Sequence, residues 1–283
     1  MNDLAVVVPT LNSAETLDWT LLSLSRLAAK CRLEVVVADS FSTDATARIC
    51  ARWGVRIVQV ERGNMYRAIN AGIGTTRARR VTYVNSDDLV YADGYRELLR
   101  RGDREEADVM YGSADFIDRE GRHLHSLEAA ESSAIGALLR SMVLPFAQPA
   151  TVYTREVFAA LNGFDESYRY AADFDFFCRA WLAGRRFARV RMPVAAFRLS
   201  PGQLSSRDRA PLLAEADAVK RRLHLQRRAL DRWELVKWKA ANIPNYAGRL
   251  LRHNMLTGRL RMVRTTDVPG VAPSRSAAGV PGL

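Results

Sequence analysis

Short apolar runs alternate with amphipathic segments along the first 110 residues of the chain. The apolar runs have the length and the β-branched content of buried strands, and they lie at residues 4–8, 33–38, 55–60 and 81–84. Between them, apolar side chains recur at helical spacing, at residues 15–27, 44–53 and 65–73. Strands and helices that alternate at this spacing predict βαβ units and a mostly parallel sheet flanked by helices, which is an α/β fold.

The second half of the chain has a less regular pattern. It predicts strands at residues 108–117, 149–153, 187–190 and 194–199, and helices at residues 155–161 and 174–183. From residue 210 the pattern is helical and basic, and the last residues are rich in Pro, Gly, Ser and Ala. We therefore expect three parts: an α/β domain at 1–209, a basic helical extension at 210–264 and a disordered tail at 265–283.

The composition is that of a globular protein, with 48% hydrophobic and 26% charged residues. No apolar run reaches 18 residues, and the N-terminus has neither a basic n-region nor a cleavage site, so we expect no transmembrane helix and no signal peptide. The three cysteines, Cys31, Cys50 and Cys178, are widely spaced and fit neither a disulfide framework nor a zinc site. Together these features predict a cytoplasmic protein with reduced cysteines.

The net charge of +11 is concentrated near the C-terminus. Residues 220–261 hold twelve Lys and Arg against two acids, together with Trp233 and Trp238. Such a segment implies an anionic partner, and the chain has no helix-turn-helix, zinc-finger or RNP pattern that would favour nucleic acid. Basic residues interleaved with Trp and Leu predict peripheral binding to an anionic membrane at its cytoplasmic face. The alternative is a solvated charged face whose aromatic side chains pack on the α/β domain.

Two adjacent acids, Asp87 and Asp88, follow the apolar run at residues 81–84. Open α/β sheets bind ligands beyond the carboxyl ends of their strands. Two carboxylates there repel each other unless a cation lies between them, and Mg²⁺ or Mn²⁺ prefers carboxylates together with substrate phosphates. The alternative is that one of these acids caps the helix that follows.

Polar residues also follow the first two predicted strands. Residues 9–12 read Pro-Thr-Leu-Asn, and Asp39 is followed by the hydroxyl-rich turn at residues 42–44. An acid at a strand end can hydrogen-bond a ribose or a base, although residues 42–44 could equally cap the next helix. Asn70 is polar in an otherwise packed helix, where it either lines the site or is a hydrogen-bonded core asparagine.

A second acidic segment lies at residues 170–179, where Asp173 opens an apolar, aromatic helix. A carboxylate near apolar aromatic side chains tends to have a raised pKa and can act as a general base. Asp175 is two residues further on and should point away from Asp173. The alternative for Asp173 is a helix cap.

These motifs follow one another in a fixed order: Val6 to Asn12, Asp39 with Ser42-Thr43-Asp44, Ala68-x-Asn70-x-Gly72, Asn85-Ser86-Asp87-Asp88, Gly163-Phe164-Asp165-Glu166, and Asp173-x-Asp175 with Arg179. The ordered set resembles the family 2 glycosyltransferases, which are inverting enzymes of the GT-A fold. The resemblance covers about residues 4–205.

The resemblance implies a nucleotide-sugar donor, an Mg²⁺ or Mn²⁺ ion, and a hydroxyl acceptor, for which we expect a lipid-linked or cell-surface glycan. It implies donor contacts from Pro9, Thr10, Asn12, Asp39, Asn70, Ser86 and Asp87. It makes Asp87, together with Asp88, the metal site, and it makes Asp173 the catalytic base. Gln148 and Pro149 would lie on the acceptor side.

The chain departs from the family pattern at several positions. Asn85 stands where the metal motif often has its first acid, Ala172 stands where many members have Glu, and Ser40-Phe41 replaces small glycines. Arg67 lies where some members carry an acid. Two alternatives to the transferase therefore stay open: an inactive nucleotide-sugar-binding protein, and a nucleotidyltransferase, although residues 9–13 are not the Gly-rich basic loop that the latter needs.

Overall fold

The computed structural model describes residues 3–199, 210–245 and 247 of the chain. Within them one mixed sheet has the strand order β3-β2-β1-β4-β8-β6-β9-β5, and β7 pairs with β6. The strands are β1 (Leu4–Thr10), β2 (Leu33–Asp39), β3 (Arg56–Gln59), β4 (Arg80–Tyr83), β5 (Leu89–Val90), β6 (Val109–Ile117), β7 (His123–Leu127), β8 (Thr151–Thr154) and β9 (Phe187–Arg198).

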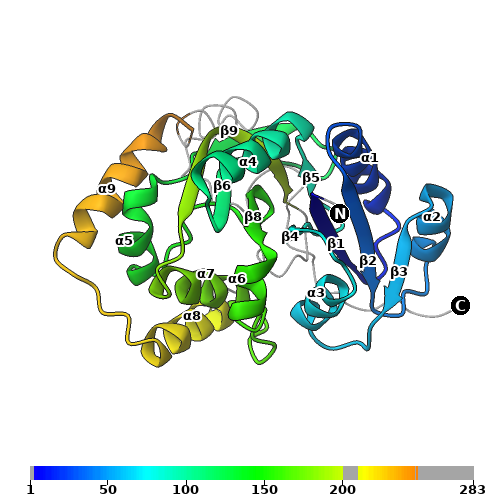
Figure 1. The fold of residues 1–283 in the computed structure, drawn as a ribbon. Coiled ribbons are helices and arrows are strands. Elements are labelled where there is room, and N and C mark those ends of the chain that lie inside the picture. The colour runs from blue at the N-terminus through cyan, green and yellow to red at the C-terminus, as the bar shows by residue number, and fades with distance from the viewer. Residues whose placement is uncertain (1–2, 200–209, 246, 248–283) are drawn as a thin grey trace, which may run out of the picture.

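Helices cover both faces of this sheet (Figure 1). They are α1 (Leu17–Ala28), α2 (Thr46–Trp53), α3 (Met65–Gly74), α4 (Ala92–Glu105), α5 (Ile135–Arg140), α6 (Arg155–Ala160), α7 (Ala172–Leu182), α8 (Ala210–Arg222) and α9 (Asp231–Ala241). The sequence of β1 is mostly apolar because both faces of the strand are buried. Alternate side chains on it enter two separate cores: Ala5 and Val7 pack with α3, and Val6 and Val8 pack with α1.

The first half of the sheet is parallel, as the sequence predicted. β1 pairs with β2 and β4, and β2 pairs with β3, all in parallel register. Thr10 and Asp39 are register partners at the ends of their strands. The carboxyl ends of β1, β2 and β4 therefore share one edge, and the polar residues after each strand are brought together there.

The second half of the sheet is mixed, and two predicted boundaries there were wrong. β8 runs antiparallel to both β4 and β6, and its predicted first residues form a 3₁₀ turn at Gln148–Ala150 instead. The two strands predicted at 187–190 and 194–199 are one strand, β9. Its pairing with β6 shifts register near Pro193, so a β-bulge accommodates the proline within one strand.

The C-terminal extension packs on the α/β body. Figure 1 shows α8 beside α7, and α9 beside α5. Ala216 and Val219 of α8 are buried in the same apolar cluster as Phe174 and Phe177 of α7. The division of the chain at residue 209 stays a prediction, and residues 248–264 of the extension and the tail at 265–283 lie outside the described residues.

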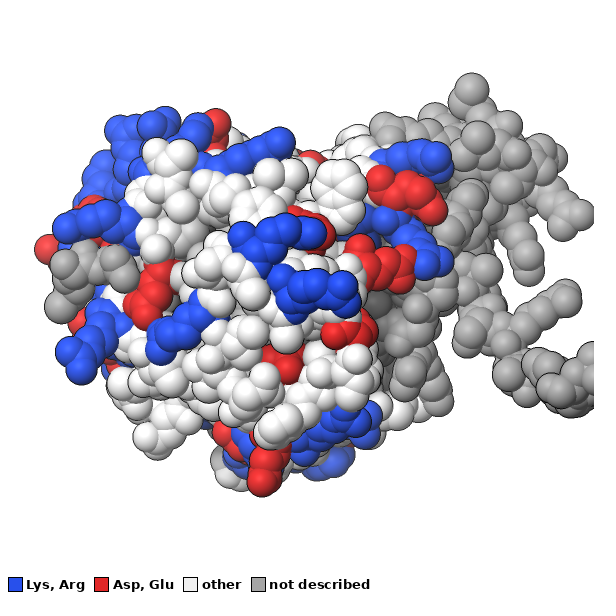
Figure 2. All heavy atoms as spheres, turned by 90° about the vertical axis from the view of Figure 1, so that its right-hand side faces the viewer, with Lys and Arg blue, Asp and Glu red and all other residues white. Residues whose placement is uncertain are grey.

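Charges of both signs are mixed on one face of the described surface (Figure 2). Figure 2 views the side of the molecule that carries α2 and β3, and there Lys and Arg alternate with Asp and Glu. Ion pairs such as Arg52–Asp18 and Arg56–Glu34 account for part of this mixing. No helix in the part of the chain that the structure describes is long and apolar enough to cross a membrane.

Candidate active site

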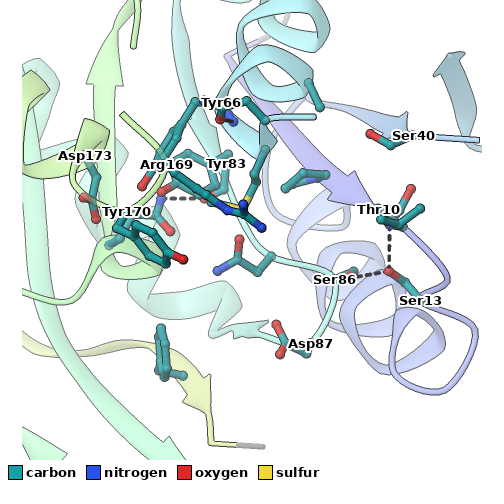
Figure 3. Close-up of a pocket in the computed structure, with 18 of the residues that line it drawn as sticks. Thr10, Ser13, Ser40, Tyr66, Tyr83, Ser86, Asp87, Arg169, Tyr170 and Asp173 are labelled. Carbon is teal, nitrogen blue, oxygen red and sulfur yellow. Dashed lines mark hydrogen bonds between the residues drawn. The ribbon is translucent and has the colours of Figure 1, made fainter. Parts of the chain in front are cut away.

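A cavity of about 880 Å³ lies at the edge where β1 and β4 end. Figure 3 shows Thr10 and Ser13 on one side of it, Tyr170 and Asp173 on the other, and Asp87 on a third. The predicted site residues that line it are Pro9, Thr10, Asn12, Ser86, Asp87, Gln148 and Asp173. The cavity walls do not include Asp39, Asn70, Asp88 and Pro149.

Asp39 holds the nucleotide-side loops together from beneath the cavity. It is 2% exposed, and its carboxylate accepts hydrogen bonds from the Thr10 hydroxyl (2.8 Å), the Ser42 amide (2.9 Å) and the Ser42 hydroxyl (2.5 Å). Ser40, the next residue, lines the cavity. The structure therefore shows Asp39 positioning Thr10, and its direct contact with a nucleotide stays a prediction.

The loops after β1 and β2 are tied to each other by short polar side chains. The side-chain oxygen of Asn12 accepts a hydrogen bond from the backbone N–H of Thr43 at 2.9 Å. The backbone N–H of Asn12 donates to the Ser42 hydroxyl at 2.8 Å. Asn12 itself has a φ of 52°, a left-handed conformation that asparagine tolerates better than most residues. Residues 42–44 thus shape the cavity wall as well as the turn before α2.

The two adjacent acids after β4 have different environments. Asp87 lines the cavity, whereas Asp88 is fully buried. The Asp88 carboxylate accepts hydrogen bonds from the Arg198 amide (2.9 Å) and the Asn85 side-chain amide (3.1 Å), and burial together with the charge of Asp87 raises its pKa well above the usual range. The prediction of Asp88 as a metal ligand does not fit this placement, because its oxygens are directed into the protein.

The residues around Asp87 fit a divalent cation that is shared with a phosphate ligand. The cavity wall also includes Asn85, whose buried side-chain oxygen has no hydrogen-bond partner among the described residues. The described residues contain no group of three or more His, Cys, Asp or Glu side chains that could hold a metal by themselves. One carboxylate and one amide oxygen suit Mg²⁺ or Mn²⁺, which take their remaining ligands from water and substrate phosphates.

Asp173 lies in the first turn of α7 on the opposite side of the cavity from Thr10 (Figure 3). Burial raises the pKa of its carboxyl to about 6, although hydrogen bonds from Phe174 (backbone N–H, 2.7 Å) and the Tyr66 side chain act in the other direction. A carboxylate with this pKa is ionised at neutral pH and is still basic enough to accept a proton.

Asp175 points away from the cavity, as its two-residue offset predicted. It is fully buried and forms ion pairs with Arg179 (2.7 Å) of its own helix and with Arg222 of α8. Its role is therefore structural.

Asn70 is a hydrogen-bonded core asparagine, which was the alternative reading of this residue. Its side-chain amide donates to the Phe164 carbonyl (2.8 Å) and to Glu166 (3.0 Å), and its oxygen accepts from the Phe164 amide (3.0 Å). A Cβ on Gly163, which has a φ of +67°, would lie 2.8 Å from this oxygen, so the close approach requires glycine. Asn70 fastens the loop after α6 to α3 and does not line the cavity.

Sequence reasoning missed several residues that complete the cavity. Arg169 and Tyr170 line it just before Asp173, with the Arg169 guanidinium 5.9 Å from the Tyr170 ring centroid. Leu212 and Leu213 of α8 line it as well. The aromatic segment around Asp173 was a signal for the first pair, but no sequence pattern indicated that the basic extension would return to the site.

The sheet and the acidic motif after β4 define a GT-A-like glycosyltransferase fold. The family model described as Glycosyl transferase family 2 matches residues 5–161, which is more than half of the chain. The chain therefore belongs to Glycosyl transferase family 2.

Among curated relatives, the chain is similar to the succinoglycan biosynthesis protein ExoO of Rhizobium meliloti (strain 1021), with 31% identity over 66% of this chain and 58% of the relative. It is also similar to the poly(ribitol-phosphate) beta-N-acetylglucosaminyltransferase TarS of Staphylococcus aureus (strain Mu50 / ATCC 700699), with 26% identity over 66% of this chain and 34% of the relative. The match thus spans less than two thirds of the length of either relative.

Solved structures share the fold at low sequence identity. S. aureus TarS 1–349 in complex with UDP-GlcNAc matches with a TM-score of 0.61 and 18% identity, over 91% of this chain and 76% of that one. The mannosyltransferase PcManGT from Pyrobaculum calidifontis, in complex with GDP-Man and Mn²⁺, matches with a TM-score of 0.60 and 18% identity, over 92% and 81% of the two chains.

Proposed function

We propose that this protein is an inverting glycosyltransferase that moves a sugar from a nucleotide-sugar donor to a hydroxyl acceptor. The observation that carries the proposal is that Asp87 and Asp173 line a single cavity from different sides. One acid is placed to hold a cation beside a phosphate, and the other is placed to accept a proton. The family membership supports this assignment, as do the UDP-GlcNAc and the GDP-Man with Mn²⁺ bound by the two structural relatives.

The donor binds, in this proposal, between the loops after β1, β2 and β4. Thr10, Asn12 and Ser86 offer hydroxyl and amide groups to the nucleotide, and Asp87 with Asn85 would hold an Mg²⁺ or Mn²⁺ ion together with the substrate phosphates. When bound, the ion would neutralise the negative charge that develops on the leaving diphosphate.

Asp173 acts as the general base on the acceptor side. It removes the proton from the acceptor hydroxyl as the hydroxyl oxygen forms a bond to the anomeric carbon. The bond from that carbon to the diphosphate breaks and leaves its electron pair on the diphosphate oxygen. Because attack and departure occur on opposite faces of the sugar, one displacement inverts the anomeric configuration without a covalent enzyme intermediate.

A turnover screen tests this function. The protein is incubated with UDP-, GDP- and TDP-sugars and Mn²⁺, and release of nucleoside diphosphate is measured with and without saccharide acceptors. We expect one nucleotide series to be turned over. A nucleotidyltransferase would instead release pyrophosphate from a nucleoside triphosphate and a sugar phosphate, and a binding protein would bind a nucleotide sugar without releasing product.

The acceptor end of the cavity is largely apolar. Met142, Leu144 and Phe174 line it from the body, and Leu212 and Leu213 line it from α8. This wall supports an acceptor with an apolar portion close to its reactive hydroxyl, and we propose a lipid-linked or cell-surface glycan. The names of ExoO, for succinoglycan biosynthesis, and of TarS, for poly(ribitol-phosphate), agree with a role in cell-envelope polysaccharides.

We further propose that α9 rests on an anionic membrane surface, which would place the enzyme at the cytoplasmic face. One side of α9 is fixed to the body, because Asp231 pairs with Arg140 (2.5 Å) and the Trp238 indole donates to the Glu128 carbonyl (2.9 Å). The other side is exposed and combines apolar with basic side chains, namely Leu230, Arg232, Trp233, Val236, Lys237, Lys239 and Ile243. Interfacial helices pair these two kinds of residue in this way.

Replacing Trp233 with Ser is expected to weaken binding to anionic vesicles by roughly 10- to 100-fold, since burying a large apolar side chain contributes about 1.5–3 kcal/mol. The measurement is flotation with vesicles of phosphatidylcholine and phosphatidylglycerol at low salt, and raised salt should reduce binding of the intact chain. Trp19→Ser is the matched control, because Trp19 on α1 is 60% exposed and Trp233 is 61% exposed. The proposal would be contradicted if both variants lost vesicle binding equally. It would also be contradicted if the intact chain did not float with the vesicles.

A further inference from the structure

The turn that leads into α7 is held by a residue from another helix. Three consecutive backbone N–H groups there donate to the carboxylate of Glu215 on α8: Arg169 at 3.0 Å, Tyr170 at 2.7 Å and Ala171 at 2.9 Å. Arg169 and Tyr170 precede the helix, and Ala171 is its N-cap residue and has no side-chain oxygen. Glu215 therefore fixes the turn before α7 from 44 to 46 positions away in the sequence.

These three N–H groups belong to the part of the chain that forms the acceptor side of the cavity. Arg169 and Tyr170 line the cavity, and Asp173 follows Ala171 by two residues. A carboxylate at this end of a helix also interacts favourably with the partial positive charge of the helix dipole. The backbone that directs Arg169, Tyr170 and Asp173 into the cavity is consequently held by Glu215.

A second residue of α8 fastens the same segment on both sides of these N–H groups. Arg222 forms ion pairs with Asp165 (2.8 Å), which precedes the segment, and with the buried Asp175, which follows it. Between Glu215 and Arg222, the buried Ala216 and Val219 pack in the apolar cluster that contains Phe174 and Phe177. Helix α8 thus contacts this segment through hydrogen bonds, ion pairs and apolar packing.

We propose that Glu215 is a positioning residue for catalysis, and that α8 is part of the catalytic unit although it follows residue 209. Glu215 does not contact the reacting atoms. It fixes the backbone from which Arg169 and Tyr170 meet the acceptor and from which Asp173 reaches the acceptor hydroxyl. This inference rests on the proposed role of Asp173 as the base.

The first test compares Glu215→Ala and Glu215→Gln with the surface control Asp217→Ala. In Glu215, one oxygen accepts from Arg169 and the other from Tyr170 and Ala171, so a glutamine, with one oxygen, must lose at least one of these bonds. Asp217 lies on the same helix but pairs with Arg221 at the surface. We expect kcat to fall by roughly 10²-fold in the alanine variant, the order of effect of a small misplacement of reacting groups, by less in the glutamine variant, and not at all in the control.

Nucleoside diphosphate affinity separates positioning from general damage. The hydrogen bonds that the structure shows for Glu215 go to residues 169–171, on the other side of the cavity from Thr10 (Figure 3), so the dissociation constant of the nucleoside diphosphate should stay within about twofold in all three variants. Wild-type kcat in Glu215→Ala would overturn the proposal. If that variant does not fold, Glu215→Gln decides, and wild-type kcat in it would overturn the proposal equally.

Amide hydrogen exchange provides a readout that does not depend on activity. We expect faster exchange at residues 169–171 in Glu215→Ala and Glu215→Gln, with unchanged exchange in β1 and β2. Unchanged protection at residues 169–171 would show that Glu215 does not hold this backbone. Failure of the base assignment is a different result, because it would leave Asp173→Asn active while exchange at 169–171 still responded to Glu215.

Discussion

Replacing Asp173 with Asn is expected to lower the rate of sugar transfer by roughly 10²–10⁴-fold, the usual contribution of a positioned general base. Asparagine keeps the size of the side chain and can still accept the Phe174 N–H, but it cannot take a proton from the acceptor. The measurement is kcat for transfer, together with the dissociation constant of the nucleoside diphosphate, which should be unchanged because the proposed donor site is on the Thr10 side of the cavity (Figure 3).

Asp175→Asn is the matched control, since it makes the same change two residues away. Asp175 is fully buried and forms ion pairs with Arg179 and Arg222. Breaking a buried ion pair should lower the free energy of unfolding of this variant by up to about 3–5 kcal/mol. Folded Asp175→Asn protein should lose much less transfer activity than Asp173→Asn, because Glu215 still holds the backbone before α7. If Asp175→Asn has normal stability but no transfer activity, and Asp173→Asn remains active, then Asp173 is not the general base.

The pH dependence of transfer should follow the titration of Asp173. Burial raises the pKa of this carboxyl to about 6, so the carboxylate gains a proton as the pH falls through that value and the base is lost. We therefore expect kcat/KM to decline below about pH 6, approaching a tenfold loss per pH unit, and to be level just above it. The residual kcat/KM of Asp173→Asn should not decline below pH 6. If it declines as in the intact protein, the titrating group is not Asp173.

The parallel half of the fold was predictable because its signals are local. Each strand from β1 to β4 is a short apolar run, and in βαβ units the ends of such strands must meet at one edge. That rule placed Thr10, Asp39 and Asp87 near one another before any side chain was known. It does not specify which way a side chain at the edge turns, and this is where the prediction of the site was incomplete.

The residues that sequence reasoning misassigned are those whose role depends on a distant partner. Asp88 is turned inward by the Arg198 amide, 110 positions away, and Asn70 is engaged by Phe164, 94 positions away. In the sequence, Glu215 is not distinguished from the other charged residues of its helix, and only the structure shows its contact with the segment before α7. Hydrophobic periodicity and motif order do not predict such pairings, because each pairing depends on tertiary contacts between residues that are distant in the sequence.

Replacing Asp87 with Ala is expected to reduce metal-dependent transfer by about 10²-fold or more, since a bound divalent ion contributes several kcal/mol of charge stabilisation in the transition state. The fold should be unaffected, because the Asp87 side chain lines the cavity, and the contact with the Arg198 guanidinium is made by its backbone carbonyl (2.8 Å). The measurements are transfer rates across a Mn²⁺ titration and the affinity of Mn²⁺ in the presence of nucleoside diphosphate. Both should weaken in the variant.

Asp88→Ala is the control that separates the two neighbouring acids. It leaves the buried Arg198 amide and the Asn85 side-chain amide without their acceptor, so it should destabilise the fold by about 1–3 kcal/mol for each unpaired group. Its folded fraction should bind Mn²⁺ more tightly than Asp87→Ala does, because it loses only the hydrogen bond that orients Asn85. Full activity of the intact protein in excess chelator would remove the metal from the mechanism. Equal loss of Mn²⁺ affinity in both alanine variants would restore Asp88 as a second ligand, against the buried position that the structure gives it.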